Sequence, residues 1–252
     1  MRTESLNGLT QKTYQVKKGD DPQFLVLDNI SVDANLKVEV KKEIGSDQKL
    51  FNTINVAYLL EMQNKIERYA LGGILREIHL VTTQDELGAN LTAVKLAKID
   101  LAFGGEINLG QNDKVDILLS NLKKTAYSSL HTFEGTSVSN AVYEVKERTF
   151  KAEELQKKID LTTTDFLVFD KNAIPSEVEF RVNGQKITRN AEALFLDQAD
   201  TFNTVGYDEN NLPIYGAYKA VVIDVRACEE VILEDNTEPR VDIKYHTIKT
   251  PY

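Results

Sequence analysis

The stretch Phe24–Asp28, with the sequence FLVLD, returns 142 positions later as Phe166–Asp170, FLVFD. One match of this length arises by accident in a chain of 252 residues, so the order of the segments that follow matters more. Each copy is followed by a short polar stretch and an alternating strand pattern, Leu36–Val40 in one half and Val178–Val182 in the other. A turn and a helical segment come next in both halves. Four elements in the same order predict an internal duplication.

The duplication also makes a prediction about side-chain direction. Alternate residues of a strand share one face, and the buried face is usually the apolar one. We therefore expect four residues of the repeated stretch to occupy corresponding inward positions in two sandwiches that superpose. These residues are Phe24, Val26, Phe166 and Val168.

Most of the chain has the composition of short strands, rich in β-branched and aromatic residues. In Val241–Ile248, apolar and polar residues alternate, which is typical of a half-buried strand. Asn183-Gly184 directly follows one strand pattern and predicts a tight turn. The predicted strands are Thr13–Lys17, Gln23–Asp28, Leu36–Lys42, Lys98–Phe103, Ala141–Val145, Phe166–Phe169, Val178–Val182, Ala220–Arg226 and Val241–Ile248.

Three segments have helical patterns. Apolar residues from Ile54 to Tyr69 recur at spacings of a helix stripe, and Gly72-Gly73 follows as a C-terminal stop. Lys151–Ile159 and Asn190–Ala199 are shorter candidates. Because no regular strand–helix–strand pattern is present, a parallel sheet is disfavoured. The fold class predicted is all-β, with antiparallel sandwiches and a few short helices in loops.

The order of these elements suggests four parts. Residues 1–20 form an N-terminal arm, residues 21–148 a first sandwich, residues 149–164 a linker and residues 165–252 a second sandwich. The linker is predicted because the segment is polar and contains the run Thr162–Thr164, as exposed domain junctions often do.

The charge of the chain argues against a nucleic-acid-binding role. The net charge is −9, from 30 basic and 39 acidic residues, and phosphate backbones repel such a surface. No sequence-specific nucleic-acid partner is expected. The first twenty residues are an exception with a small basic excess, so they are either an ordinary frayed terminus or an arm that touches lipid or genome phosphate. The basic residues of this arm are Arg2, Lys12, Lys17 and Lys18.

The sequence offers no motif of a catalytic centre. His79, His131 and His246 lie far apart, and no zinc-type spacing of histidine or cysteine is present. Cys228 is the only cysteine, and the carboxylates of Glu229 and Glu230 beside it disfavour a reactive thiolate. No serine elbow, phosphate loop or dinucleotide fingerprint occurs. We therefore predict that the protein is not an enzyme.

Adjacent carboxylates occur at four places, but neighbouring residues of a strand point to opposite faces and form no site by themselves. No cofactor is predicted, and a structural calcium ion bound by acidic loops is the only alternative left open. The pairs are Asp20-Asp21, Asp85-Glu86, Glu153-Glu154 and Glu229-Glu230. Apolar runs are too short for a membrane span, and residues 1–20 lack the apolar segment of a signal peptide, so synthesis in a cytoplasm is expected.

The second half of the chain resembles a known family. Val178–Lys186, a helix, Ala220–Arg226 and the closing strand Val241–Ile248 follow the plan of corticovirus-type bacteriophage major capsid proteins. The resemblance implies two tandem β-sandwich jelly rolls, a double jelly roll. It also implies homotrimers that form pseudo-hexagonal capsomers of an icosahedral virion shell around an internal membrane.

Under this resemblance the partners are two further copies of the chain, neighbouring capsomers, other virion proteins and the viral membrane. The expected location is the virion capsid, after synthesis in the host cytoplasm. Two other classes of function remain open from the residues alone. One is a virion spike, adhesin or carbohydrate-binding β-sandwich protein, and the other is an enzyme whose acidic residues are distant in sequence.

Overall fold

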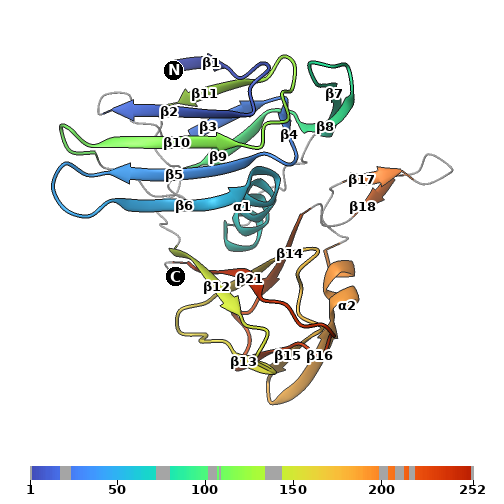
Figure 1. The fold of residues 1–252 in the computed structure, drawn as a ribbon. Helices are drawn as coiled ribbons and strands as arrows, with labels where there is room; N and C mark the ends of the chain where they lie inside the picture. The colour runs from blue at the N-terminus through green and yellow to red at the C-terminus, as the bar shows by residue number, and fades with distance from the viewer. Residues whose placement is uncertain are drawn as a thin grey trace. The chain divides into compact units, whose positions relative to one another are not determined.

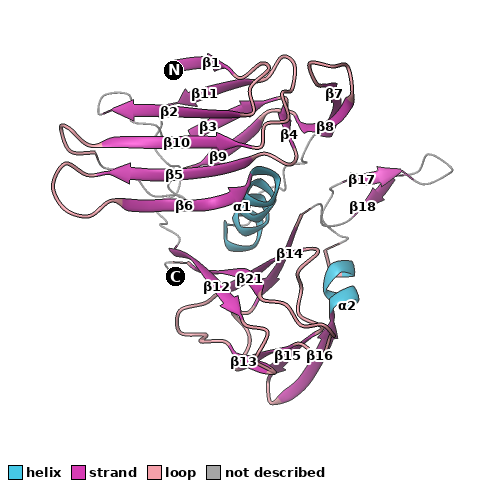
Figure 2. Ribbon diagram, viewed as in Figure 1, coloured by secondary structure: helices cyan, strands magenta, loops and turns pink. Residues whose placement is uncertain are grey.

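The computed structural model describes residues 2–17, 24–71, 80–101, 107, 109–133, 144–198, 204–207, 213–215 and 219–250. The chain divides into two compact units. Unit 1 comprises Met1–Gln63 and Ile78–Val142, and unit 2 comprises Asn64–Glu77 and Tyr143–Tyr252. Both units consist mainly of strands, as Figures 1 and 2 show. The helix α1 (Val56–Leu71) therefore contributes its first half to unit 1 and its second half to unit 2.

Unit 1 contains two four-stranded antiparallel sheets. Their strand orders are β1-β11-β3-β9 and β2-β10-β5-β6. The strands are β1 (Arg2–Ser5), β2 (Gln11–Lys17), β3 (Phe24–Asp28), β5 (Asn35–Lys41), β6 (Gln48–Asn55), β9 (Ala97–Asp100), β10 (Lys114–Ser120) and β11 (Ser129–Phe133). A small third sheet joins β4 (Ile30–Ser31), β8 (Asn90–Val94) and β7 (Leu80–Gln84).

Unit 2 also contains two four-stranded antiparallel sheets. Their orders are β12-β21-β14-β19 and β13-β20-β15-β16. The strands are β12 (Glu144–Phe150), β13 (Gln156–Lys158), β14 (Phe166–Asp170), β15 (Glu177–Val182), β16 (Gln185–Asn190), β19 (Ala220–Asp224), β20 (Glu230–Glu234) and β21 (Ile243–Lys249). The helix α2 (Ala191–Leu196) follows β16, and β17 (Thr204–Tyr207) pairs with β18 (Pro213–Tyr215).

The two units have the same strand connectivity. When the eight sandwich strands of each unit are counted along the chain, one sheet has the order 1-8-3-6 and the other 2-7-4-5. Eight strands wound in this way form a jelly roll. We call the two sandwiches roll 1 and roll 2. The predicted fold class, an all-β chain with two tandem jelly rolls and few helices, is confirmed.

The repeated pentapeptides form the third strand of each roll, β3 and β14. The prediction about their faces was wrong. In β3 the fully buried residues are Leu25 and Leu27, while Phe24 and Val26 are half-buried on the outer face. In β14 all four apolar residues are buried. Alternation could not identify the inner face, because both faces of this strand are apolar.

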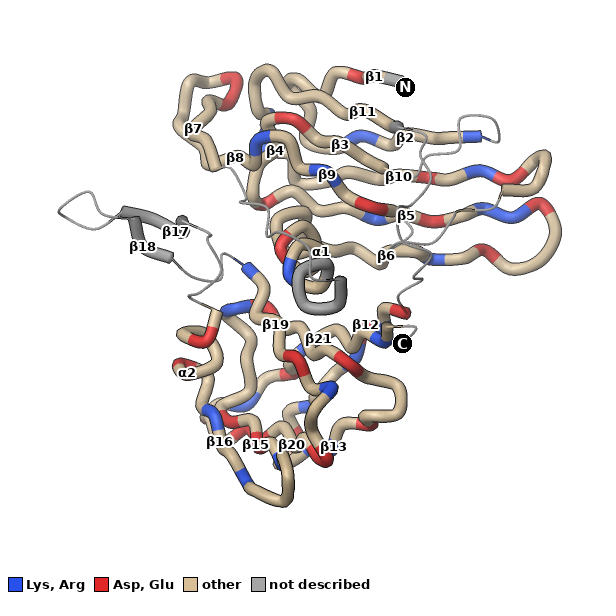
Figure 3. Tube along the Cα trace, turned by 180° about the vertical axis from the view of Figure 1, so that it is seen from behind, with Lys and Arg blue, Asp and Glu red and all other residues tan. Residues whose placement is uncertain are grey.

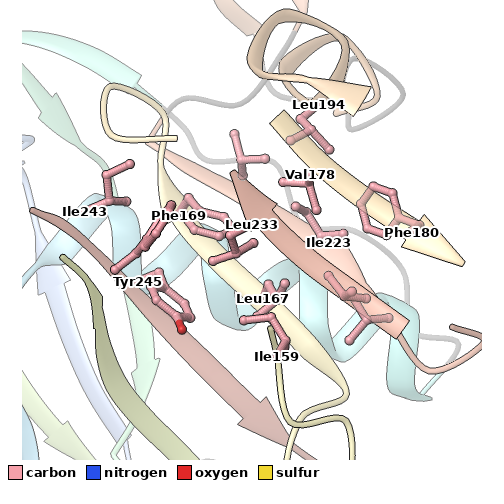
Figure 4. Close-up of a cluster of buried hydrophobic side chains, with 14 residues drawn as sticks. Ile159, Leu167, Phe169, Val178, Phe180, Leu194, Ile223, Leu233, Ile243 and Tyr245 are labelled. Atoms are coloured by element: carbon pink, nitrogen blue, oxygen red, sulfur yellow. The ribbon is translucent and has the colours of Figure 1, made fainter. Parts of the chain in front are cut away.

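The core of roll 2 lies between its two sheets (Figure 4). Leu167 and Phe169 point into it from β14, together with Ile243 and Tyr245 from β21. The rings of Phe169 and Tyr245 stack with their centroids 5.3 Å apart. Burial raises the pKa of the Tyr245 phenol to about 12. The aromatic residues of the first sheet therefore anchor the centre of this sandwich.

Several local predictions are confirmed. Asn183 and Gly184 both adopt positive φ, 50° and 73°, in the turn between β15 and β16, as a tight hairpin turn requires. The two predicted helices around Ile54–Tyr69 and Asn190–Ala199 exist as α1 and α2. Asn190 caps α2, because its side chain accepts a hydrogen bond from the Ala193 amide.

The third predicted helix, over Lys151–Ile159, does not form. The Glu154 amide donates to the Lys151 carbonyl in a turn, and the chain then enters β13. In β13, Lys157 pairs with Leu233 of β20. Cross-strand hydrogen bonding therefore overrides a charged sequence that has good local helix propensity.

The predicted domain boundaries also need correction. Residues 1–20 contain β1 and β2, which pair with β11 and β10, so they belong to roll 1 and are not an arm. Tyr14 and Val16 of β2 are buried, which ties this segment to the sandwich. Residues 149–164 contain the end of β12 and all of β13, so roll 2 begins before the predicted linker. These two strands give the second half its full complement of eight.

A glutamine closes the outer edge of the sixth strand in both rolls. In roll 1, the Gln63 side chain on α1 donates to the Asp100 carbonyl at 2.7 Å and accepts from the Asp100 amide at 3.2 Å. In roll 2, the Gln198 side chain after α2 bonds the carbonyl and amide of Val222 at 3.1 and 3.2 Å. Asp100 lies on β9 and Val222 on β19, the last strands of their sheets. A side-chain amide thus supplies the pairing that an edge strand lacks.

We expect Phe169→Ala to destabilise roll 2 by about 3–5 kcal/mol, because a large fully buried ring leaves a cavity. Chemical denaturation of the purified protein measures this change. Leu155, whose side chain is 57% exposed, provides the control, since Leu155→Ala should change stability by no more than about 0.5 kcal/mol. Equal effects of the two substitutions would contradict the assigned core.

The edge glutamines give a second prediction. Gln198→Met removes the partners of the Val222 amide and carbonyl, at a cost of about 1–3 kcal/mol. Hydrogen exchange at the Val222 amide should accelerate. Gln63→Met should do the same at Asp100 and leave Val222 unchanged. If neither substitution alters exchange at its own strand, the edges are closed in another way.

Candidate functional surfaces

The histidines and the cysteine that the sequence singled out are structural in the described residues. The His131 ring nitrogens lie 2.9 Å from the hydroxyls of Thr3 and Ser129, respectively. Burial lowers the pKa of His246, although Glu147 opposes this shift. Burial and the nearby Asp224 raise the pKa of the Cys228 thiol, which disfavours a thiolate. His79 lies outside the described residues.

The predicted carboxylate pairs serve turns and ion pairs. Asp85 accepts from the amides of Leu87 and Ala89, and Glu154 accepts from the Lys151 amide. In the remaining described pair, Glu229 accepts from the Gly184 amide and Glu230 binds Lys158. Asp20 and Asp21 lie outside the described residues. Among the residues with described positions, no group of three His, Cys, Asp or Glu could hold a metal ion. Binding of structural calcium stays a prediction.

Of the basic residues near the N-terminus, the structure describes the side chains of Lys12 and Lys17. Lys12 of β2 forms an ion pair with Glu4 of β1 at 2.6 Å, which joins the two sheets of roll 1. Lys17 is exposed at the end of β2. Lys18 and the side chain of Arg2 lie outside what the structure describes. Contact of this segment with lipid or genome phosphate therefore stays a prediction. In the described part of the chain, no helix is long and apolar enough to cross a membrane.

The outer faces of the second sheets are polar and charged. In roll 2, Lys186 binds Glu179 and Lys158 binds Glu230, both at 2.6 Å. In roll 1, Lys41 lies 2.9 Å from Glu39 on its own strand β5. Figure 3 shows acidic and basic positions interspersed along the strands and loops. Paired charges of this kind belong to a hydrated surface, and they offer no concentrated field for a ligand.

The first sheet of roll 2 differs, because on β14 and part of β19 the outward side chains are apolar and buried. On β14 the outward residues are Phe166 and Val168, both 0% exposed, and on β19 they are Ala220 and Val222, 0% and 2% exposed. We call these four residues the closed face. At the free edge of β19, the amine of the fully buried Lys65, which belongs to unit 2, donates to the Ala220 carbonyl at 2.9 Å.

The equivalent surface of roll 1 is covered only in part. The strand registers match Phe24 and Val26 of β3 to Phe166 and Val168 of β14, and Lys98 of β9 to Val222 of β19. Leu96 lies immediately before β9. Phe24 and Val26 are half-buried, Leu96 is 62% exposed, and Lys98 is exposed with its amine 4.0 Å from the centre of the Phe24 ring. We call these four residues the open face. The open face therefore presents apolar side chains, partly accessible to solvent, next to one amine.

Sequence reasoning missed the open face, although a signal was present. The run Phe24–Leu27 has no polar residue, so it is apolar on both faces, and a strand of this kind needs cover on both sides. The sequence prediction assigned Phe24 and Val26 to the core and did not consider what covers the opposite face of the strand.

Further apolar side chains are exposed at the loops of roll 1. Leu87 and Tyr127 are 93% and 84% exposed, in loops joined by the bridge between Asp85 and Thr125. Tyr127 has φ of 58°, an uncommon conformation for a bulky residue. These loops therefore present large apolar side chains to solvent.

Another loop of roll 1 presents Ile44, which is 88% exposed. The Asp113 carboxylate orders this loop by accepting from the Lys42 amine and from the amides of Glu43 and Gly110. These bonds lower the pKa of Asp113 to about 2, with Lys42 the largest cause.

Roll 2 contains a pocket of about 360 Å³ between β15, β16, α2 and β19. Phe180, Ile187 and Leu194 contribute an apolar lining, and Arg189 and Asp197 form an ion pair at its rim, 3.6 Å apart. The apolar part of this lining suits an apolar group, and Asp224 also lines the pocket.

Comparison with known proteins gives likenesses in structure alone. No family model matches the chain, and no curated protein sequence matches it. The structure is similar to the crystal structure of the major capsid protein P2 from bacteriophage PM2, with 11% identity, coverage of 97% of this chain and 92% of that chain, and a TM-score of 0.46. It is also similar to the PBSX exported protein XepA, with 10% identity, coverage of 98% and 85%, and a TM-score of 0.23. The expected likeness to a phage major capsid protein is thus found in the structure as well.

Proposed function

We propose that this protein is the major capsid protein of a bacteriophage virion, with a structural and non-enzymatic role. The identical connectivity of the two rolls carries the proposal. A chain with two like rolls gives a threefold ring six similar sides, and such a ring can tile the facets of an icosahedral shell as a pseudo-hexagonal block. Closed symmetry leaves no unpaired interface within the ring.

The distribution of side chains supports a role based on shape. The described histidines, cysteine and acidic pairs are engaged in structural contacts, whereas large apolar side chains are exposed on loops and on the open face. Exposed apolar clusters on a folded protein favour protein–protein contact. Partners in the proposal are two further copies of the chain, neighbouring capsomers and other virion proteins.

The location that follows is the virion, after synthesis in the host cytoplasm. The proposal includes an internal membrane beneath the shell, where exposed lysines such as Lys17 would meet lipid phosphates. The net charge of −9 keeps the remaining surface hydrated and unsuited to sequence-specific binding of nucleic acid.

A glycan-binding spike or adhesin is the second candidate. The exposed Tyr127 favours it, because an exposed aromatic ring can stack on a sugar. Saturable binding on a glycan array that is lost in Tyr127→Ala would support this candidate and count against a purely structural role.

The capsid proposal predicts a trimer in solution. Light scattering of the purified full-length chain should give three times the chain mass of 28.4 kDa, over a range of micromolar concentrations. A monomer at the highest concentration would contradict the proposal, and so would a dimer, because neither provides the threefold ring.

A further inference from the structure

We propose that the pocket of roll 2 is a binding site for a small uncharged amphiphile, a molecule with a hydrocarbon body and one neutral hydrogen-bonding group at its end. The inference concerns roll 2 by itself and goes beyond the capsid role. It starts from a comparison of the same place in the two rolls, where the fifth strand ends and a helix begins.

The helices α1 and α2 begin and are anchored in the same way. The amide three residues later donates to the side chain of Asn55 before α1 and of Asn190 before α2, at 3.0 and 2.8 Å. Eight positions after each asparagine, Gln63 or Gln198 binds the sixth strand of its own roll. Positions counted from the asparagine are therefore equivalent in the two rolls.

One side of α1 faces the sheets of roll 1. Leu59, Met62 and Gln63 share this side, because they are spaced by three and four residues, and Gln63 binds β9. Leu59 and Met62 are both 0% exposed. The equivalent residues of roll 2, all of which line the pocket, are Leu194, Asp197 and Gln198.

Two buried apolar residues of roll 1 are replaced by an ion pair in roll 2. Ile54 is 8% exposed and Met62 is 0% exposed. At the equivalent positions, Arg189 and Asp197 lie 3.6 Å apart, with side chains 48% and 58% exposed. Ile54 and Arg189 match because each directly precedes the capping asparagine and lies opposite the second residue of the fourth strand. The apolar closure of roll 1 is thus absent from roll 2.

A neighbouring pair of positions shows the same difference. Phe51 of β6 lies opposite Val38 and is 4% exposed, whereas Ile187 of β16 lies opposite Phe180 and is 37% exposed. Roll 1 therefore fills this place with its own side chains, whereas roll 2 has a pocket of about 360 Å³. Since an apolar cavity of about 150 Å³ already takes up benzene, the pocket has room for a small organic molecule.

The inner lining of the pocket selects a hydrocarbon body. Three of its residues, Phe180, Leu194 and Ile223, also belong to the core of roll 2 (Figure 4), so the pocket reaches the apolar interior. Burial of apolar area is the main term that favours binding there. The apolar lining residues are Phe180, Val182, Ile187, Leu194, Val222, Ile223, Ala227 and Cys228.

The charged lining residues select a neutral end group. Asp224 is held by two hydrogen bonds from Arg226, at 3.0 and 2.6 Å, and Asp197 has Arg189 as its partner. A charged ligand would bring a like charge to one member of the latter pair. The 3.6 Å between Arg189 and Asp197 exceeds the length of a hydrogen bond, so a hydroxyl group can accept from the guanidinium and donate to the carboxylate.

Thermal unfolding of the purified full-length chain with octanol tests the site. A ligand that binds the folded state should raise the unfolding midpoint, here by about 2–4 °C near saturation. Octanoate and octylammonium have the same chain with a negative or a positive end, and each should raise the midpoint less than octanol.

The chain itself supplies the variant that closes the pocket. The double variant Arg189→Ile with Asp197→Met gives roll 2 the two side chains of roll 1, and the rise with octanol should disappear. Leu196→Ala is the matched control, because Leu196 lies on α2, is 59% exposed and does not line the pocket. This control should keep the full rise.

Cys228 gives a second readout that does not depend on the double variant. It is the only cysteine of the chain and it lines the pocket. Octanol should therefore slow its alkylation by N-ethylmaleimide at least about threefold, which mass spectrometry of the intact chain measures.

Octanol that neither raises the midpoint nor protects Cys228 in the wild-type chain would overturn the site, and so would an equal rise in the folded double variant. Protection of Cys228 at high protein concentration without octanol would assign the pocket to a second copy of the chain and would also overturn it. A rise in the wild type and in Leu196→Ala that is lost in the double variant supports the site.

Discussion

The third strand of each roll carries apolar side chains on both of its faces. Other residues therefore have to shield each face from water. In β14 the side chains of both faces are buried, because Leu167 and Phe169 enter the core and Phe166 and Val168 are buried on the outer side. In β3 the inner side chains Leu25 and Leu27 are fully buried, whereas the outer side chains Phe24 and Val26 are only half-buried. Burial of apolar area is the main favourable term in folding and in association, so the incomplete cover of β3 favours assembly. The fold and the proposed function depend on this constraint.

The edges of the sheets impose a second constraint, since unpaired strands invite aggregation. Gln63 and Gln198 bind outer backbone groups of the sixth strands β9 and β19. These groups are therefore not available to pair with a strand of another chain. Basic residues protect another edge, with Lys186 and Arg189 on the wholly exposed β16. A protein that assembles at high concentration needs its contacts restricted to chosen surfaces. Among the described surfaces, the open face and the apolar loops expose large apolar side chains that could make such contacts.

Much of the fold was predictable from local patterns. The pentapeptide repeat, the Asn183-Gly184 turn and the stripe of α1 led to two like β-sandwiches, and the structure confirms them. Short strands with clear alternation, such as Ile243–Lys249, were found for the same reason. The helix predicted at Lys151–Ile159 failed because β13 gains its stability from β20, 72 or more residues away in the chain, and no local pattern reports such a partner. The hydrogen bonds from Gln63 and Gln198 to the edge strands were missed for a similar reason, because their partners lie 37 and 24 positions away in the chain. The unbroken apolar run Phe24–Leu27 indicated that both faces of β3 are apolar. It did not indicate which residues cover the outer face.

The central claim is that the outer face of β3 is covered by assembly, whereas that of β14 is covered within the chain. Hydroxyl-radical footprinting of dissociated and assembled protein, read by mass spectrometry at single residues, tests it most directly. The account predicts that Phe166 is protected in both states, and that Phe24 and Leu96 react in the dissociated chain and become protected on assembly. Equal reactivity of Phe24 and Leu96 in the two states would contradict it.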